Sequence, residues 1–171
     1  MTGVQTCALP ILDSGRLEQV ATPRQLYEAP ASRWIAEFVG DINMIEGQIE
    51  GAAEHRLTIS TRDAGTIVAA EPRQPVSKTT ICVAIRPEKV KLSRRGPVSD
   101  QAGAIPMNRL EGVVIEVNYL GGVTTYKVKL DAGAVLRASM ANTARLDMDA
   151  YNASQRVTAW FTPDDCVVLE Q

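Results

Sequence analysis

Residues 110–130, LEGVVIEVNYLGGVTTYKVKL, decide the fold of this chain. Apolar residues alternate with others on either side of Gly121-Gly122, as in strands that bury one face. In the second strand the apolar residues oppose Lys127 and Lys129. The first strand is expected to place four side chains on one face: Val113, Ile115, Val117 and Tyr119. The two glycines suit a tight turn, so the stretch predicts a β-hairpin.

Similar short apolar stretches fill most of the chain from residue 44 onward. The predicted strands are 44–50, 56–60, 66–69, 79–86, 89–93, 110–120, 123–130, 135–140, 156–161 and 166–169. Loops are expected at 71–77, 94–106 and 146–154. Many short strands with no long helix between them predict a mainly β protein built as a small barrel. No internal repeat is strong enough to assert from the sequence.

The segment before residue 44 has a different pattern. Residues 11–12 and 17–20 predict a short hairpin. Thr22, Pro23 and Gln25 have the order of a capping box with proline at the first helical position, and the helix should end before Pro30. A second short helix is expected from Ser32 to a stop at Gly40.

These elements are too small to be stable alone, because short helices and isolated hairpins are marginal in water. They nevertheless carry six apolar side chains: Leu26, Tyr27, Trp34, Ile35, Phe38 and Val39. Each is worth roughly 1.5–3 kcal/mol when buried. We expect this set to dock on a surface that the chain does not supply; the alternative is that it packs on the β-rich part of the same chain.

Composition excludes several classes of function. The net charge is -2 and aromatic residues are 5% of the chain, which argues against nucleic-acid binding. Cys7, Cys82 and Cys166 form no CxxC motif, which is typical of reduced thiols in a cytoplasmic protein. No apolar run is long enough to span a bilayer. Residues 1–11 are interpreted as a non-native leader rather than a signal peptide.

Five stretches together resemble one protein family. They are GRLEQVATPRQLYEAPASRWIAEFVG at 15–40, VAIRPEKV at 83–90, NRLEGV at 108–113, YLG at 119–121, and residues 160–169. In this order they resemble the C-terminal part of ATP-binding subunits of spermidine/putrescine-type ABC importers. The stretch I-R-P-E is similar to a signature of their regulatory, TOBE-type domain, which is similar to OB-fold barrels.

The resemblance implies a fold class and a division of the chain. It implies an OB-fold-like small barrel or barrels, preceded by a hairpin and two short helices left from a truncated nucleotide-binding domain. The expected divisions are 1–11 as leader, 12–43 as the remnant and linker, and 44–171 as the regulatory domain. The chain has no G-x-x-x-x-G-K-[ST] loop for phosphates. ATP and Mg are therefore expected only in the parent family, and no catalytic residue, cofactor or metal is expected here.

The resemblance also implies partners. A regulatory and dimerisation module would meet a second ATPase subunit and, through the parent protein, the membrane subunits, at the cytoplasmic face of the membrane. The residues expected at interfaces or at the domain junction are Asn43, Arg86, Glu88, Tyr119 and Leu120.

Residue chemistry supports these choices only in part. Pro87 cannot donate to a ladder, so it should end the strand at 79–86. Arg86 and Glu88 flank this corner and are expected either to brace it internally or to contact a partner through charge-assisted hydrogen bonds. Asn43 is expected to tolerate unusual backbone angles at the junction.

Two interpretations compete with the regulatory one. An OB-type barrel could bind nucleic acid, which the charge and the few aromatic residues disfavour. A barrel of this kind could sense a small ligand. The best anion-contact candidate is a basic cluster, which a solvated edge strand explains equally well: Arg86, Lys89, Lys91, Arg94 and Arg95.

Overall fold

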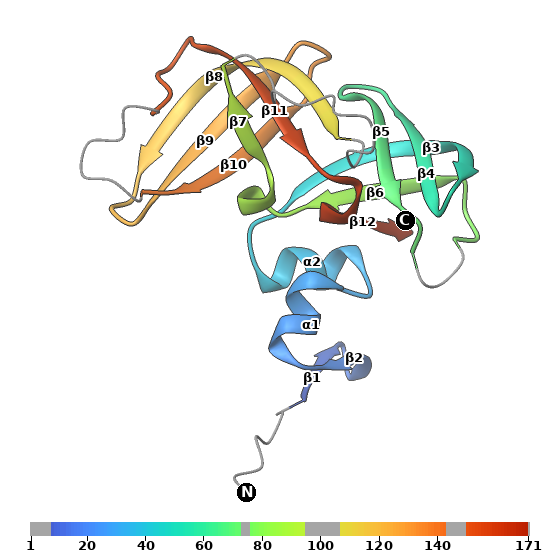
Figure 1. The fold of residues 1–171 in the computed structure, drawn as a ribbon. Helices are drawn as coiled ribbons and strands as arrows, with labels where there is room; N and C mark the ends of the chain where they lie inside the picture. The colour runs from blue at the N-terminus through green and yellow to red at the C-terminus, as the bar shows by residue number, and fades with distance from the viewer. Residues whose placement is uncertain (1–7, 73–75, 95–106, 143–149, 171) are drawn as a thin grey trace, which may run out of the picture.

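The computed structural model describes residues 8–72, 76–94, 107–142 and 150–170. A small N-terminal segment of two helices and a hairpin lies below two curved antiparallel sheets (Figure 1). The mainly β fold class predicted from the sequence is confirmed. Most of the proposed leader, with Cys7, lies outside the described residues, as do large parts of the loops expected at 94–106 and 146–154.

The N-terminal segment has the predicted elements, in the order β1 (Leu9–Asp13), β2 (Arg16–Ala21), α1 (Pro23–Glu28) and α2 (Arg33–Val39). Thr22 and Gln25 cap α1 reciprocally: the Gln25 amide donates to Thr22 Oγ1 at 3.3 Å, and the Thr22 amide donates to Gln25 Oε1 at 3.0 Å. The Ile35 amide donates to Ser32 Oγ at 3.3 Å and so caps α2. The predicted capping signals are confirmed.

The apolar set of this segment divides into two groups. Leu26 and Ile35 are buried in a small cluster with Ala21, and Ile11 and Val39 pack against it. Trp34 and Phe38 instead stack on each other with ring centroids 5.2 Å apart and remain 40% and 66% exposed. The segment therefore has a core of its own and also presents an aromatic surface.

Each sheet has five strands. The first has the order β12-β6-β3-β4-β5 and the second the order β10-β9-β8-β11-β7. Their bounds are β3 (Asn43–Ala53), β4 (Arg56–Thr61), β5 (Gly65–Ala70), β6 (Thr80–Ile85), β7 (Lys91–Ser93), β8 (Asn108–Tyr119), β9 (Val123–Leu130), β10 (Val135–Ala141), β11 (Arg156–Phe161) and β12 (Cys166–Glu170). Short 3-10 turns precede β7 (η1, Pro87–Lys89) and β12 (η2, Pro163–Asp165). One buried apolar cluster joins the inner faces of the two sheets.

The β region is an internal repeat of two halves, which the sequence analysis did not find. Strands β3 to β7 make one half and β8 to β12 the other, and each half ends with a 3-10 turn and a strand. NMIEGQI at 43–49 corresponds to NRLEGVV at 108–114, and residues 80–93 correspond without a gap to 156–169. The halves exchange their last strands, because β7 pairs with β11 and β12 pairs with β6. The two halves are therefore interlocked.

Corresponding glycines allow close contact between strands in both halves. A Cβ on Gly47 would lie 2.8 Å from the Ser60 carbonyl oxygen, and one on Gly112 would lie 2.6 Å from that of Lys129. A β-bulge follows each glycine, between Ile49 and Gly51 in β3 and between Val114 and Glu116 in β8.

The bulge in β8 corrects one expectation. Val113 pairs with Lys129, whereas Val117 pairs with Tyr126 and Tyr119 with Thr124. Val113 therefore lies on the face opposite to Val117 and Tyr119, because the extra residue, Ile115, shifts the alternation. The prediction that all four share one face was wrong.

Two buried asparagines tie the halves together. The Asn43 side chain donates to the Arg137 carbonyl at 2.9 Å and accepts from its amide at 2.7 Å. Asn108 makes the same pair of bonds to Val68, both at 2.8 Å. Each amide thus satisfies the backbone of an edge strand in the other sheet. The expected reason for Asn43 was wrong, because its φ is not positive.

Candidate functional site

The candidate site is the junction between the helices and the first sheet, and Arg86 is at its centre. Arg86 follows β6 and is only 4% exposed. Its Nη1 donates to the carbonyl oxygens of Ala36 at 3.0 Å, Gly40 at 3.0 Å and Asp41 at 3.1 Å. Its Nη2 donates to the Tyr27 carbonyl at 3.1 Å, and its Nε reaches the same oxygen at 3.4 Å. One guanidinium therefore binds four carbonyls of the N-terminal segment.

These carbonyls need a partner because they lie near helix ends. The last carbonyls of a helix have no intrahelical donor. Tyr27 lies in the last turn of α1, and Gly40 is the C-cap of α2. A planar guanidinium carries five N–H donors on three nitrogens, so it can bind several oxygens at once. A lysine ammonium carries all its donors on one nitrogen and cannot reproduce this arrangement.

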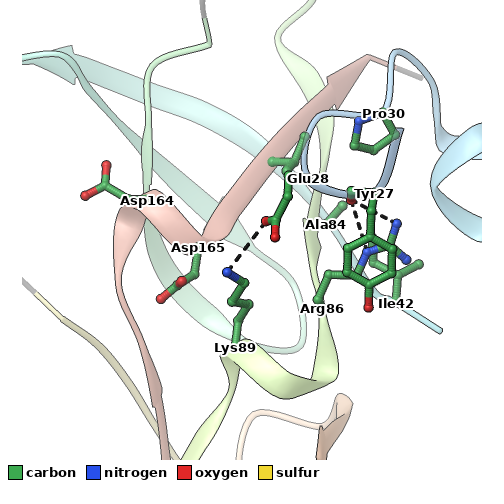
Figure 2. Close-up of a pocket in the computed structure, with 10 residues that line it drawn as sticks. Tyr27, Glu28, Pro30, Ile42, Ala84, Arg86, Lys89, Asp164 and Asp165 are labelled. Carbon is green, nitrogen blue, oxygen red and sulfur yellow. Dashed lines mark hydrogen bonds and ion pairs between the residues drawn. The ribbon is translucent and has the colours of Figure 1, made fainter. Parts of the chain in front are cut away.

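Tyr27 packs on Arg86 and connects it to Glu88. The Arg86 guanidinium carbon lies 4.1 Å from the Tyr27 ring centroid, which is a cation–π contact. The Tyr27 hydroxyl donates to Glu88 Oε1 at 2.7 Å. Burial, and then the hydrogen bond to Glu88, raise the pKa of Tyr27. Figure 2 shows the tyrosine ring against the arginine at this junction.

The linker after Gly40 is also held from the second sheet. Asp41 Oδ1 accepts from Arg137 Nη1 at 2.9 Å, and Asn43 binds the backbone of the same Arg137. Arg86 lies beyond β6 of the first sheet and Arg137 lies in β10 of the second. The short linker is therefore bonded to both halves of the β region.

A pocket of about 30 Å³ adjoins Arg86, with Glu28, Lys89, Asp164 and Asp165 among its lining residues (Figure 2). Lys89 Nζ lies 3.6 Å from Glu28 Oε2. Asp165 is already engaged, since its carboxylate accepts from the amide and hydroxyl of Thr162. The pocket has room for little more than one water molecule.

The basic residues named as an anion site do not converge. Arg86 binds carbonyls and Lys89 pairs with Glu28. Lys91 Nζ donates to the Glu88 carbonyl at 2.8 Å, and Arg94 donates to that of Ala150 at 3.4 Å. Arg95 lies outside the described residues.

Tyr119 and Leu120 lie at a different place, the turn between β8 and β9 in the second half. They are 73% and 71% exposed. Asn142 braces the turn: its amide donates to the Gly122 carbonyl at 2.9 Å and its side chain donates to the Gly121 carbonyl at 2.6 Å. A fixed turn therefore presents an aromatic and an aliphatic side chain to the outside.

A larger groove of about 220 Å³ lies between the halves, lined by the β4–β5 turn, the start of β8 and the β9–β10 turn. Its carboxylates are engaged. Glu111 accepts from the Thr158 hydroxyl at 2.8 Å, and Asp131 forms an ion pair with Arg156.

The described residues contain no group of histidine, cysteine and acidic side chains that could hold a metal ion. Cys82 and Cys166 are buried, and burial followed by the charges of Asp165 and Asp164 raises the pKa of Cys166 to about 12. Such thiols are poor nucleophiles at neutral pH. No helix in this part of the chain is long and apolar enough to cross a membrane.

Sequence reasoning missed three residues that the structure uses. Tyr27 was counted only as an apolar side chain, and Arg137 was not singled out. Asn108 was noted only within the motif NRLEGV. The shared spacing of Asn, Glu and Gly at 43–47 and 108–112 was the available signal for Asn108.

The TOBE domain model matches residues 83–169, which is more than half of the chain and includes Arg86, Glu88 and all of the second half except Glu170. The chain belongs to the TOBE domain family. The family expected from the sequence is therefore confirmed.

Relatives of this TOBE protein include ATP-binding proteins of importers. The spermidine/putrescine import ATP-binding protein PotA of Trichormus variabilis is 31% identical over 168 residues, which cover 95% of this chain and 41% of PotA. The putrescine transport ATP-binding protein PotG of Escherichia coli is 28% identical over 162 residues, covering 94% of this chain and 41% of PotG. The TOBE chain thus spans about two fifths of the length of these relatives.

A solved structure shares the fold of this TOBE protein. The cytoplasmic molybdate-binding protein ModG, in a form with molybdate bound, is 13% identical and aligns with a TM-score of 0.59. The alignment covers 75% of this chain and 96% of the ModG chain. This likeness agrees with the OB-fold-like barrels expected from the sequence.

Proposed function

We propose that this TOBE chain is the regulatory and dimerisation portion of the ATP-binding subunit of a polyamine importer for putrescine or spermidine. The parent subunit would couple ATP hydrolysis to uptake through membrane subunits at the cytoplasmic face. The observation that carries the proposal is the exposed Trp34–Phe38 stack on α2, next to a junction held by Arg86. In a subunit as long as its relatives, this aromatic surface docks on the ATP-binding part.

A chimera tests this proposal. The corresponding region of Escherichia coli PotG, whose similarity covers 94% of this chain, is replaced by this chain, and putrescine uptake is measured in cells that lack PotG. We expect uptake from the chimera and its loss when Trp34→Asp and Phe38→Asp are combined. Val135→Asp, at an exposed apolar position in β10, is the matched control and should leave uptake unchanged. A stable chimera without uptake would refute the proposal.

The dimerisation part rests on the braced turn that carries Tyr119 and Leu120. Exposed aromatic and aliphatic residues on a fixed turn suit a protein interface. In the second ATPase subunit the same turn, or a surface facing it, would complete the contact. We expect Leu120→Asp to weaken self-association in sedimentation equilibrium. Ala52→Asp, near the tip of the corresponding hairpin, is the control and should have no effect; a wild-type chain that stays monomeric at every concentration contradicts this part.

A second candidate function is the sensing of a small ligand. The groove between the halves and the shared fold with ModG, which was solved with molybdate, favour it. Calorimetry with putrescine, spermidine and molybdate tests it: a saturable, stoichiometric heat supports sensing, and its absence supports a contact module.

A further inference from the structure

We infer that the Arg86 guanidinium locks the helices to the first half of the β region and that Arg137 ties the same linker to the second half, so that the linker at 40–43 is a fixed joint and not a hinge. The regulatory meaning rests on the proposed function. If the chain belongs to a moving ATPase, the β region follows the helices as one body.

The number and origin of the bonds support this role. Arg86 binds carbonyls from α1, from α2, from its C-cap and from the linker, and its guanidinium is stacked on the Tyr27 ring. A partial displacement of the helices would break several of these bonds together while the guanidinium is still covered by the Tyr27 ring. Because an unpaired buried charge is costly, the bonded state is strongly preferred.

The contacts of Arg137 extend the joint to the second sheet. Arg137 binds the Asp41 carboxylate with its guanidinium and the Asn43 amide with its backbone. A hinge needs a few residues that are free to change their φ and ψ angles. In this linker, backbone or side-chain atoms of Gly40, Asp41 and Asn43 are all held from the β region.

The internal repeat provides a control within the molecule. Thr162 stands where Arg86 stands in the first half, and Pro163 corresponds to Pro87. The Thr162 hydroxyl donates to Asp165 at 2.7 Å, within its own corner. The β-strand, 3-10 turn and β-strand therefore form without an arginine. Arg86 is dispensable for the corner itself, and its bonds are directed to the helices.

Spin-label distance measurements on the full chain test the inference. Labels are attached to Arg24→Cys in α1 and Ala53→Cys in β3, both exposed positions, with Cys7→Ser as background. Cys82 and Cys166 are buried and are not expected to take the label. We expect a single narrow distance distribution in the parent and a broad one in Arg86→Thr. A broad distribution in the parent, or an unchanged one in Arg86→Thr, would overturn the inference.

Three further measurements distinguish the loss of the Arg86 contacts from the loss of the fold. Amide exchange in 24–42 should rise at least tenfold in Arg86→Thr, while the amides of β8 and β9 keep their protection. Arg86→Lys, which keeps the charge but loses the fork of donors, should also broaden the distribution. Methylguanidinium at millimolar concentration should narrow the distribution of Arg86→Thr, whereas methylammonium should not. Equal rescue by both cations, or by neither, would contradict the guanidinium-specific role. None of these measurements requires a transporter, so they can fail independently of the proposed function.

Discussion

The two halves of the β region have the same plan but differ at three places. At the corner before the last strand, the first half has Arg86 and the second Thr162. At the first hairpin, the first half has Glu54 and His55, while the second has Tyr119 and Leu120 exposed. On the outer face, α2 covers the first sheet through Ala36, whereas the second sheet has no helix on it in the described structure.

Other features are present in both halves. Both halves keep an asparagine, a close-packed glycine and a bulge in the first strand. We expect the features that both halves share to be needed for the barrel fold. We expect the features found in only one half to contact other parts of a subunit. The predictions below test this division.

The largest effect is expected from the asparagines. Asn108→Ala leaves the Val68 amide and carbonyl without partners, at a cost of roughly 1–3 kcal/mol for each buried group. Asn43→Ala should cost a similar amount at Arg137. Urea unfolding measures both. If one of the two variants were as stable as wild type, the hydrogen bonds of Asn43 and Asn108 would not be equivalent.

The glycines come next. Gly112→Ala forces a Cβ to within 2.6 Å of a backbone oxygen and should destabilise the protein by about 1–3 kcal/mol through overpacking. Gly47→Ala should behave likewise. Gly51→Ala, where nothing lies within 4 Å of the added Cβ, is the control. Thermal melting that ranks Gly51→Ala with the other two would refute the close-packing explanation.

The stability contributed by the junction of Tyr27 and Arg86 should depend on alkaline pH, whereas the corner at Thr162 has no tyrosine to give this dependence. Because the pKa of Tyr27 is raised by burial and by Glu88, its contribution to stability is complete below its unfolded pKa of ~10 and is lost as the pH rises through the folded value. Tyr27→Phe should therefore be less stable than wild type by about 1 kcal/mol at neutral pH, and this gap should close in alkali. Urea unfolding at neutral and at alkaline pH measures this difference in the free energy of unfolding between Tyr27→Phe and wild type. A gap that is the same at high pH would rule out the Tyr27–Glu88 bond as its source.

The smallest effect is expected at an exposed ion pair that only the second half has. Lys127 and then Asn118 lower the pKa of Glu116, so its contribution is present above the unfolded carboxyl pKa and is lost as the pH falls through the folded value. Glu116→Gln should remove only this weak acid dependence, because exposed pairs contribute little. Urea unfolding at acidic and neutral pH measures it, and a large loss at neutral pH would contradict this ranking.

The strands and corners could be predicted because their signals are local. Alternation gave the strands, Pro87 ended β6, and Thr22 with Gln25 started α1. The repeat was missed because the halves share few identities outside Asn, Glu and Gly of the first strand. The bulge at Ile115 was missed because alternation continues through it in the sequence while the pairing shifts.

The site was harder to predict because its bonds link distant residues. Arg86 and Glu88 were chosen from a motif, but their partner Tyr27 lies some sixty positions earlier and looked like an ordinary apolar residue. Backbone carbonyls have no signature in a sequence, so the acceptors of Arg86 could not be named. Likewise nothing in the sequence connected Asn43 to Arg137, which lies in the other half.

The exchange of β7 and β12 between the sheets limits how this molecule can be divided or built. A cut after Arg94 would give two pieces, each lacking the fifth strand of its own sheet and holding the one that completes the other. Neither piece could close a barrel by itself, but the two could reassemble by trading strands.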